Sequence, residues 1–376
     1  MRRAELLGAA LLLAAAATGA APTPDPWTIG LFIPTRGDRT PLGVEIVKGA
    51  ETAVDRINRN GGVGGRKLRL AMASSDLPWD GASRDLVRLL YDEGAAAIVG
   101  ASDGRSAHLA EQIVTRARGD VVFVTPWATE TTLTRVRVPW FFQVAPDDRR
   151  QAAALSREIF ETRGIRRVAI WTEDSFDGRS RAEAFLREAP AGSVREFASE
   201  DPERVGALAQ GIERGEFGAL LLLGSPGPAA ELIRRAIPEN SPLLVLAPMA
   251  LAVPEFLQTA WSLPEGRVLV VLPAGAGETP AAAAFTREFL RRNGTAPTLA
   301  AALSYDAVSA VAEGLRRAAQ HPQEGLPKAL AAVTLDGAAG SLRFDRFLGR
   351  EGAPSLLEVR GGEWFPFRHG DPSARR

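Results

Sequence analysis

Cysteine is absent from the 376-residue sequence, histidine occurs three times, and neither sign of charge is in excess. Without cysteine, disulfides, thiol catalysis and Cys-ligated metal sites are excluded. The histidines, His108, His321 and His369, are far apart in sequence, which argues against a histidine-rich metal site. Lysine plus arginine and aspartate plus glutamate each number 45, so nothing favours nucleic acid or an anionic membrane surface as a partner. We therefore expect no metal and no cofactor.

Hydrophobic runs of membrane-spanning length are also missing from the chain. The N-terminus combines a basic start, "MRR", a short apolar run, "LLGAALLLAAAA", and small residues before a proline-rich break. This pattern predicts a secretory signal peptide over residues 1–20, cleaved after Ala20 or Ala21. The alternative is an N-terminal membrane anchor, but no cysteine is present at the cleavage point to carry a lipid. We expect a soluble protein exported to the periplasm.

Strand and helix patterns alternate along the rest of the chain. "TIGLFIP" predicts a buried strand, and "GVEIVKGAETAVDRIN" has apolar residues at the three- and four-residue spacing of an amphipathic helix. The alternation continues to "VVFVTP" and begins again after "PWFFQVAPDDRRQ". Without its signal peptide the chain has roughly 355 residues, more than one hydrophobic core usually serves. The sequence therefore predicts two α/β lobes with parallel, doubly wound sheets.

One short segment raises the question of catalysis. Residues Gly100 to Gly104, "GASDG", fit G-x-S-x-G, the strand-to-helix turn that presents a nucleophilic serine in many hydrolases. A serine hydrolase that uses Ser102 is therefore one hypothesis. The alternative is a turn after a parallel strand, where small residues and helix N-terminal amides let a ligand approach the backbone.

A longer series of motifs resembles a known family. The segment "IGLFIPTRGDRTPLGVEIVKGAETAVDRINRNGGVGGRKLRL", with "VTPWATETTLT" and "LSYDAVSAVAEGL", is similar to periplasmic solute-binding proteins of the leucine/isoleucine/valine-binding type. The resemblance covers about residues 27 to 368. It implies two Rossmann-like lobes with parallel central sheets, joined by three crossover strands. Lobe 1 would comprise residues 27–146 plus 272–341, and lobe 2 residues 147–271 plus 342–368.

This resemblance implies binding and no enzymatic activity. The chain would capture a small organic solute in the cleft between its lobes and deliver it to the membrane permease and ATPase of an ABC importer. We expect it to act as a monomer. The alternative is a ligand sensor that passes a signal to a receptor or regulator. The serine hydrolase remains a third hypothesis.

The resemblance also suggests which residues contact the ligand. Gly104 stands where amino-acid-binding members have a ligand-binding serine, and Ser102 and Arg105 are close to it. Trp127 either forms a stacking wall or packs in the core. Phe176 matches an aromatic residue that closes over the ligand. The predicted ligand-binding residues are Ser102, Gly104, Arg105, Trp127, Ala128, Thr129, Phe176, Ser225 and Met249.

Met249 stands where the amino-acid binders carry a glutamate that pairs with the ligand's ammonium group. A thioether cannot replace a carboxylate in that role. We therefore expect a neutral or anionic cargo, such as an organic acid or amide, unless Asp174, Asp177 or another acid reaches the site. If Arg105 points into the cleft, it would pair with the carboxylate of an acidic cargo. Arg39, in the loop after the first strand, either faces the same cleft or lies in solvent.

Overall fold

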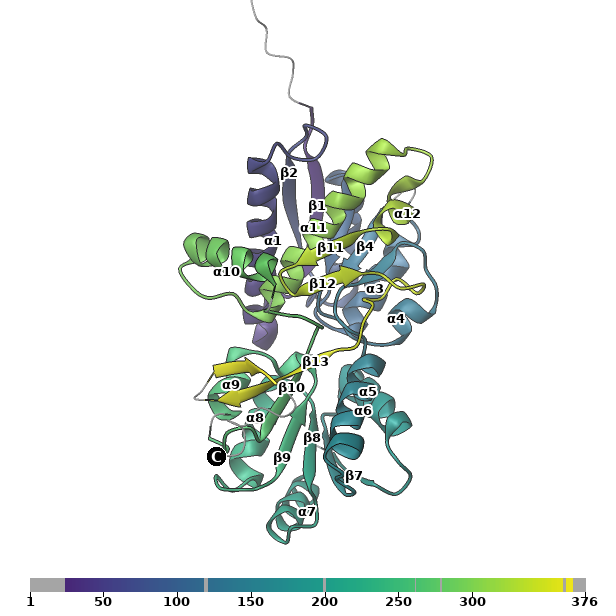
Figure 1. Cartoon of the computed structure of the whole chain (residues 1–376). Helices are drawn as coiled ribbons and strands as arrows, with labels where there is room; N and C mark the ends of the chain where they lie inside the picture. Colours follow the sequence, from purple (N-terminus) through teal and green to yellow (C-terminus); the bar gives the residue numbers. More distant parts are fainter. Residues whose placement is uncertain are drawn as a thin grey trace, which may run out of the picture.

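The computed structural model describes residues 24–117, 121–198, 201–260, 262–277, 279–360 and 363–367. The predicted signal peptide over residues 1–20 lies outside these ranges. In the described ranges, no helix is both long and apolar enough to cross a lipid bilayer. Figure 1 shows the two-lobed architecture, with one central sheet in each lobe.

The sheet of the first lobe has five parallel strands in the order β2-β1-β3-β4-β5. The strands are β1 (Trp27–Ile33), β2 (Leu68–Ser74), β3 (Ala95–Gly100), β4 (Val122–Thr125) and β5 (Phe141–Gln143). Side chains of a strand alternate between the two faces of its sheet, and both faces are buried here. Leu31 therefore packs in one apolar cluster and Phe32 in another.

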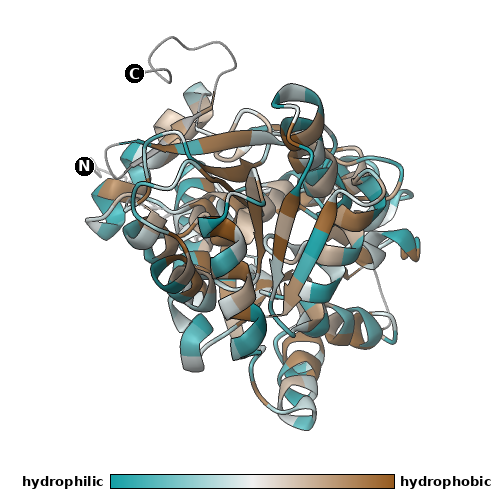
Figure 2. Ribbon diagram, turned by 90° about the horizontal axis from the view of Figure 1, so that it is seen from below, coloured by the Kyte–Doolittle hydropathy of each residue, from teal (hydrophilic) through white to brown (hydrophobic). Residues whose placement is uncertain are grey.

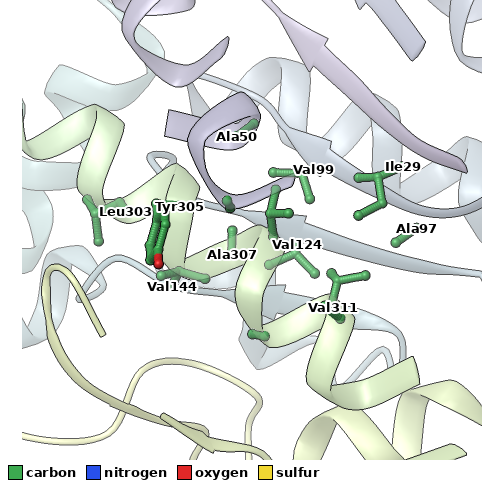
Figure 3. Packing of buried hydrophobic residues seen from close by; sticks show 14 of the residues in the cluster. Ile29, Ala50, Ala97, Val99, Val124, Val144, Leu303, Tyr305, Ala307 and Val311 are labelled. Carbon is green, nitrogen blue, oxygen red and sulfur yellow. The ribbon is translucent and has the colours of Figure 1, made fainter. Parts of the chain in front are cut away.

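Helices from two distant parts of the chain cover the two faces of this sheet. They are α1 (Thr40–Arg59), α2 (Trp79–Val87), α3 (Gly104–Val114), α4 (Thr132–Arg135), α10 (Pro280–Asn293), α11 (Leu299–Gln320) and α12 (Gly325–Ala331). Helix α11 packs closely against α1, where a Cβ on Gly49 would lie 2.1 Å from the carbonyl oxygen of Ala301. Figure 3 shows the buried cluster between α1, α11 and the sheet, including Ile29, Val124 and Tyr305.

The sheet of the second lobe has seven strands in the order β14-β13-β10-β9-β8-β6-β7. The strands are β6 (Val168–Thr172), β7 (Val194–Ala198), β8 (Ala219–Leu223), β9 (Leu244–Ala247), β10 (Val268–Leu272), β13 (Ser355–Arg360) and β14 (Glu363–Pro366). Strands β6 to β10 are parallel, whereas β13 and β14 add an antiparallel edge that the sequence patterns did not predict.

Alternation along β8 again divides the core of the second lobe into two layers. Leu220 and Leu222 face one side of the sheet, and Leu221 and Leu223 face the other. The first side is covered by α7 (Pro202–Glu213), α8 (Pro226–Ala236) and α9 (Pro254–Ala260), and the second by α5 (Asp148–Ser156) and α6 (Phe176–Glu188). In Figure 2 the strands are mostly brown and many helices carry teal segments, as this burial pattern requires.

The chain passes between the two lobes three times: after β5, after β10, and between the hairpin β11 (Thr334–Gly337)–β12 (Gly340–Arg343) and β13. The buried carboxylate of Asp306 on α11 fixes this hairpin, because it accepts hydrogen bonds from the amides of Ala338 (2.6 Å) and Ala339 (2.9 Å). Arg350, in the returning segment, donates to the carbonyl oxygen of Ala339 at 2.7 Å. The predicted architecture of two α/β lobes is thus present, and the lobe boundaries given above stay predictions.

Candidate functional site

The segments that follow β3, β4, β5, β6 and β9 all lie at carboxyl ends of parallel strands, the edge at which open α/β sheets place their ligand sites. Three contacts join these segments. The Gly104 amide donates to Asp177 Oδ1 at 2.9 Å, the Asp148 amide donates to the Thr129 carbonyl at 2.7 Å, and the Met249 amide donates to Gln151 Oε1 at 2.8 Å. The first two join elements of the two lobes, so these segments meet at the junction.

Ser102 lies in the turn between β3 and α3 and is buried. Its Oγ accepts a hydrogen bond from Arg39 Nη1 and lies within hydrogen-bond distance of Asp103 Oδ2, both at 3.3 Å. Arg39 also pairs with the Asp103 carboxylate, so this arginine reaches the turn from the first loop. The hydrogen bonds found for the His108 ring are to other groups, not to Ser102. Among the described residues no histidine is hydrogen-bonded to Ser102, so the serine–histidine pair that activates the nucleophile of a hydrolase is not formed there.

Ala128 and Thr129 follow β4, and both are buried. The Ala128 amide donates to Thr125 Oγ1 at 3.1 Å, and its carbonyl accepts from Gln143 Nε2 at 2.9 Å. Thr129 instead turns toward the second lobe, since its carbonyl oxygen accepts a hydrogen bond from the Asp148 amide at 2.7 Å. Residues of the first lobe thus meet an acid at the beginning of α5.

Gly104 begins α3 where the second lobe comes closest. An added Cβ would lie 2.8 Å from Phe176 Cε1, 2.9 Å from Asp177 Oδ1 and 3.0 Å from Glu130 Cβ. Phe176 begins α6, and its ring lies edge-on to the His108 ring with 6.0 Å between centroids. Gly104 is therefore a packing requirement of the junction, because a larger residue would displace one of these neighbours.

Two aspartates of the second lobe lie at this junction, Asp148 buried and Asp177 half-buried. Asp148 accepts a hydrogen bond from Ser180 Oγ at 2.7 Å and lies 3.8 Å from Arg181 Nε, and Asp177 lies 3.9 Å from Arg181 Nη2. Burial raises the pKa of Asp148 to about 6, although Arg181 and the Ser180 hydroxyl oppose the rise. Burial also raises the pKa of Asp177.

His108 lies on α3 between two carboxylates. Its Nδ1 is 3.2 Å from Glu111 Oε2, and its Nε2 is 2.9 Å from Glu130 Oε2. The hydrogen bonds to Glu111 and Glu130 raise the pKa of His108 to about 9, although partial burial opposes the rise. The ring beside Phe176 is therefore a cation at neutral pH.

The structure brings four of the predicted residues together at the junction: Ser102, Gly104, Thr129 and Phe176. Trp127 and Met249 are buried in one apolar cluster. Of the two alternatives for Trp127, packing in the core is the one that the structure shows. Arg105 is exposed on α3. Ser225 precedes α8, and its amide and hydroxyl both donate to the Glu173 carboxylate. The residues that the motif analysis missed are His108, Glu130, Asp148, Glu173 and Arg181.

Comparison with known proteins identifies the family. Residues 26–354 match the family model described as periplasmic binding protein. The chain belongs to the periplasmic binding protein family. This family consists of solute-binding proteins of ABC transporters without enzymatic activity, so the serine-hydrolase hypothesis for Ser102 is not supported.

The relatives of this periplasmic binding protein include Leu/Ile/Val-binding proteins. It is 29% identical over 174 residues to Leu/Ile/Val-binding protein BraC3 of Rhizobium johnstonii, covering 46% of each chain. It is 28% identical over 171 residues to Leu/Ile/Val-binding protein homolog 3 of Brucella melitensis, covering 45% of each. The chain thus spans about half the length of the curated relatives it matches.

Solved structures show the same fold over almost the whole chain. The isoleucine complex of LivJ from Streptococcus pneumoniae has a TM-score of 0.77 at 20% identity and covers 90% of this chain and 97% of LivJ. The leucine-binding protein LivK from Thermotoga maritima has a TM-score of 0.78 at 19% identity, covering 91% and 98%. A solute-binding protein from R. palustris in complex with benzoate has a TM-score of 0.75 at 19% identity, covering 91% and 95%. At these identities the likeness establishes the fold.

Proposed function

We propose that this protein binds a small organic solute between its two lobes and delivers it to the permease and ATPase of an ABC importer. The observation that carries the proposal is the meeting of two sheet edges at Gly104–Asp177 and Thr129–Asp148, in a chain of the periplasmic binding protein family. The lobes would be residues 27–146 plus 272–341 and residues 147–271 plus 342–368. Export to the periplasm, with cleavage near Ala20 or Ala21, is part of the same proposal.

The solute would contact the buried polar groups and the aromatic side chain at the junction. Ser102 and Thr129 offer hydroxyl groups, and Phe176, a residue that is 37% exposed, offers an aromatic ring. Trp127, Ala128 and Met249 lie in the apolar clusters, and we keep them as predicted contacts from the family alignment. We also keep Gly104, Arg105 and Ser225 on this basis. The related structures in complex with isoleucine and with benzoate support a cargo of amino-acid or aromatic-acid size.

A thermal-shift screen of amino acids, organic acids and their amides tests this proposal. A ligand at 100 times its dissociation constant stabilises the folded state by about 2.7 kcal/mol, which produces a measurable rise in Tm. Small-angle X-ray scattering on the best ligand should then give a smaller radius of gyration with ligand than without, because ligand closes two lobes about a hinge. A screen without stabilising solutes would contradict the proposal. A ligand that stabilises the protein but leaves the radius of gyration unchanged would contradict closure by the ligand and would agree with lobes already in contact at Gly104 and Asp177.

A matched pair of variants locates the site. Thr129→Val removes a hydroxyl at the junction and should weaken binding of the best ligand. Thr131→Val is the control, because the buried Thr131 hydroxyl has no hydrogen-bond partner among the described residues. Equal affinities of the two variants would place the ligand away from Thr129.

A further inference from the structure

The N-terminus of α3 is occupied by a carboxylate from the other lobe. Gly104 is the first residue of this 11-residue helix, and its amide donates to Asp177 Oδ1 at 2.9 Å. The Ser106 amide donates to Asp103 Oδ1 at 2.8 Å. Helix N-terminal amides carry a partial positive charge and favour anions. Here the chain's own aspartates fill both of these positions.

The fit between the lobes at this point is close. The absence of a side chain on Gly104 leaves space for Asp177 and for the Phe176 ring, which would both lie within 3 Å of an added Cβ. Phe176 and Asp177 are the first two residues of α6. The beginning of α6 therefore packs directly against the beginning of α3, and the carboxylate is held where it meets the amide.

Asp177 is supported by a charged group from its own lobe and faces charged groups of both lobes. Arg181, one turn later on α6, lies 3.9 Å from Asp177 and 3.8 Å from Asp148. On the first lobe, Asp103 and its partner Arg39 act on Asp177 through space. A ligand carboxylate at the Gly104 amide would therefore meet Asp177 and Asp103 together, and like charges without a new cation repel.

We infer that Asp177 is a built-in anion that holds the two lobes together at the N-terminus of α3 and disfavours cargo that places a carboxylate there. This rests on the proposed function and narrows its substrate class. A cargo with a neutral or cationic group at this point can bind while Asp177 keeps its contact. A cargo with an anionic group must first displace Asp177 from the Gly104 amide. Asp177 thus determines both specificity and closure.

The first test measures closure without any ligand. Because the chain has no cysteine, Gln112→Cys on α3 and Glu188→Cys on α6, both at exposed positions, give two unique sites for spin labels. Pulsed EPR should show a longer and broader distance distribution for Asp177→Ala than for the parent. Asp174→Ala is the matched control, because Asp174 lies three residues earlier, just before α6, but pairs with Arg179 at the surface, and it should leave the distribution unchanged. The same distribution in Asp177→Ala and the parent would overturn the inference.

The second test uses acetate as the anion and the Gly104 amide resonance as the reporter. In the wild type, acetate should leave this resonance unchanged, because Asp177 occupies the amide. In Asp177→Ala acetate should bind there with at least about tenfold higher affinity, and Asp177→Asn should lie between the two because it keeps the acceptor oxygen without the charge. A Gly104 resonance that responds to acetate equally in all three proteins, or in none, would overturn the inference.

Neither test uses the transported solute. The proposed transport function and the proposed role of Asp177 can therefore be contradicted independently. If the solute screen fails and these experiments succeed, only the proposed transport function is contradicted. If a solute binds and closes the lobes but Asp177→Ala behaves as the wild type in both tests, only the role of Asp177 falls.

Discussion

The Nε2 atom of His108 lies 2.9 Å from the carboxylate of Glu130, within the first lobe and next to the ring of Phe176 from the second. Together with Glu111 on the other ring nitrogen, this contact raises the pKa of His108 to about 9. The histidine is therefore expected to be charged on the lobe surface that α6 packs against.

The first prediction is that the stabilising effect of this cation is lost in mild alkali. The folded-state pKa lies above the ordinary value of 6.5, so the contribution is complete below about pH 6.5 and disappears as the pH rises through about 9. Its size should be on the order of 2 kcal/mol. Chemical denaturation across this range should show a decline for the wild type that His108→Gln lacks. An NMR titration that places His108 near 6.5 would contradict this.

The second prediction is that the ionisation of Asp148 also makes the free energy of unfolding depend on pH. Here the cause is burial of a carboxyl group and not an ion pair. Burial raises its pKa from 3.8 to about 6, so the folded state binds a proton that the unfolded state has already released. The free energy of unfolding should therefore fall as the pH rises from about 4 to about 6, by up to about 3 kcal/mol. Asp148→Asn should lose this decline. Asp306 titrates in the same pH range in the wild type and in Asp148→Asn, so its effect cancels when the two stability profiles are subtracted. Parallel pH profiles for wild type and variant would refute the prediction.

The fold was predictable because its signals are local. The amphipathic spacing in α1, the glycines that end it and the apolar run of β1 each lie within one segment, and alternation of such segments indicates a parallel sheet. The antiparallel edge of the second sheet has a local signal for its hairpin, two strand-like runs on either side of Gly361-Gly362, but no local signal for where that hairpin pairs. Strand β13 pairs with β10, more than 80 residues earlier in the chain, and β14 pairs with β13. Pairing at that separation is decided by packing, which a local pattern does not encode.

The site was predictable only in part, for the same reason. The turn at Ser102 and Gly104 was found because a small-residue turn follows a strand. The partner of Gly104 is 73 residues away, so nothing near the turn indicated that Asp177 would occupy its amide. The consecutive acids Asp147 and Asp148 after β5 were a usable signal, since acids at a strand's carboxyl end often serve a site.

A third prediction concerns Ser102. Its hydroxyl lies near Asp103 and Arg39, and no histidine of the described residues is hydrogen-bonded to it, so the protein should not react with a fluorophosphonate probe at this residue. Ser102→Ala should cost only about 1 kcal/mol of stability, the usual value of a lost hydrogen bond. Mass spectrometry of the probe-treated protein gives the answer. Covalent labelling of Ser102 would revive the hydrolase hypothesis.

The last prediction uses Gly104 itself. Gly104→Ala places a Cβ within 3 Å of both Phe176 and Asp177, so the beginnings of α3 and α6 must move apart. The ligand-free protein should then have a larger radius of gyration by small-angle scattering. Gly206→Ala is the matched control, because Gly206 is a helical glycine with open space around it, and this change should add about 0.5–1 kcal/mol of stability without altering the radius.

A rescue experiment separates lobe opening from a simple loss of folding in Gly104→Ala. The nearest clash is with Phe176, a half-exposed side chain. Adding Phe176→Ala should remove this contact and bring the radius of gyration part of the way back to the wild-type value. The Asp177 carboxylate would still have to shift, because it lies 2.9 Å from the same Cβ. Full restoration by Phe176→Ala alone would mean that the ring, and not the carboxylate, sets the distance between the lobes. An unchanged radius in Gly104→Ala would mean that the junction yields without separation of the lobes.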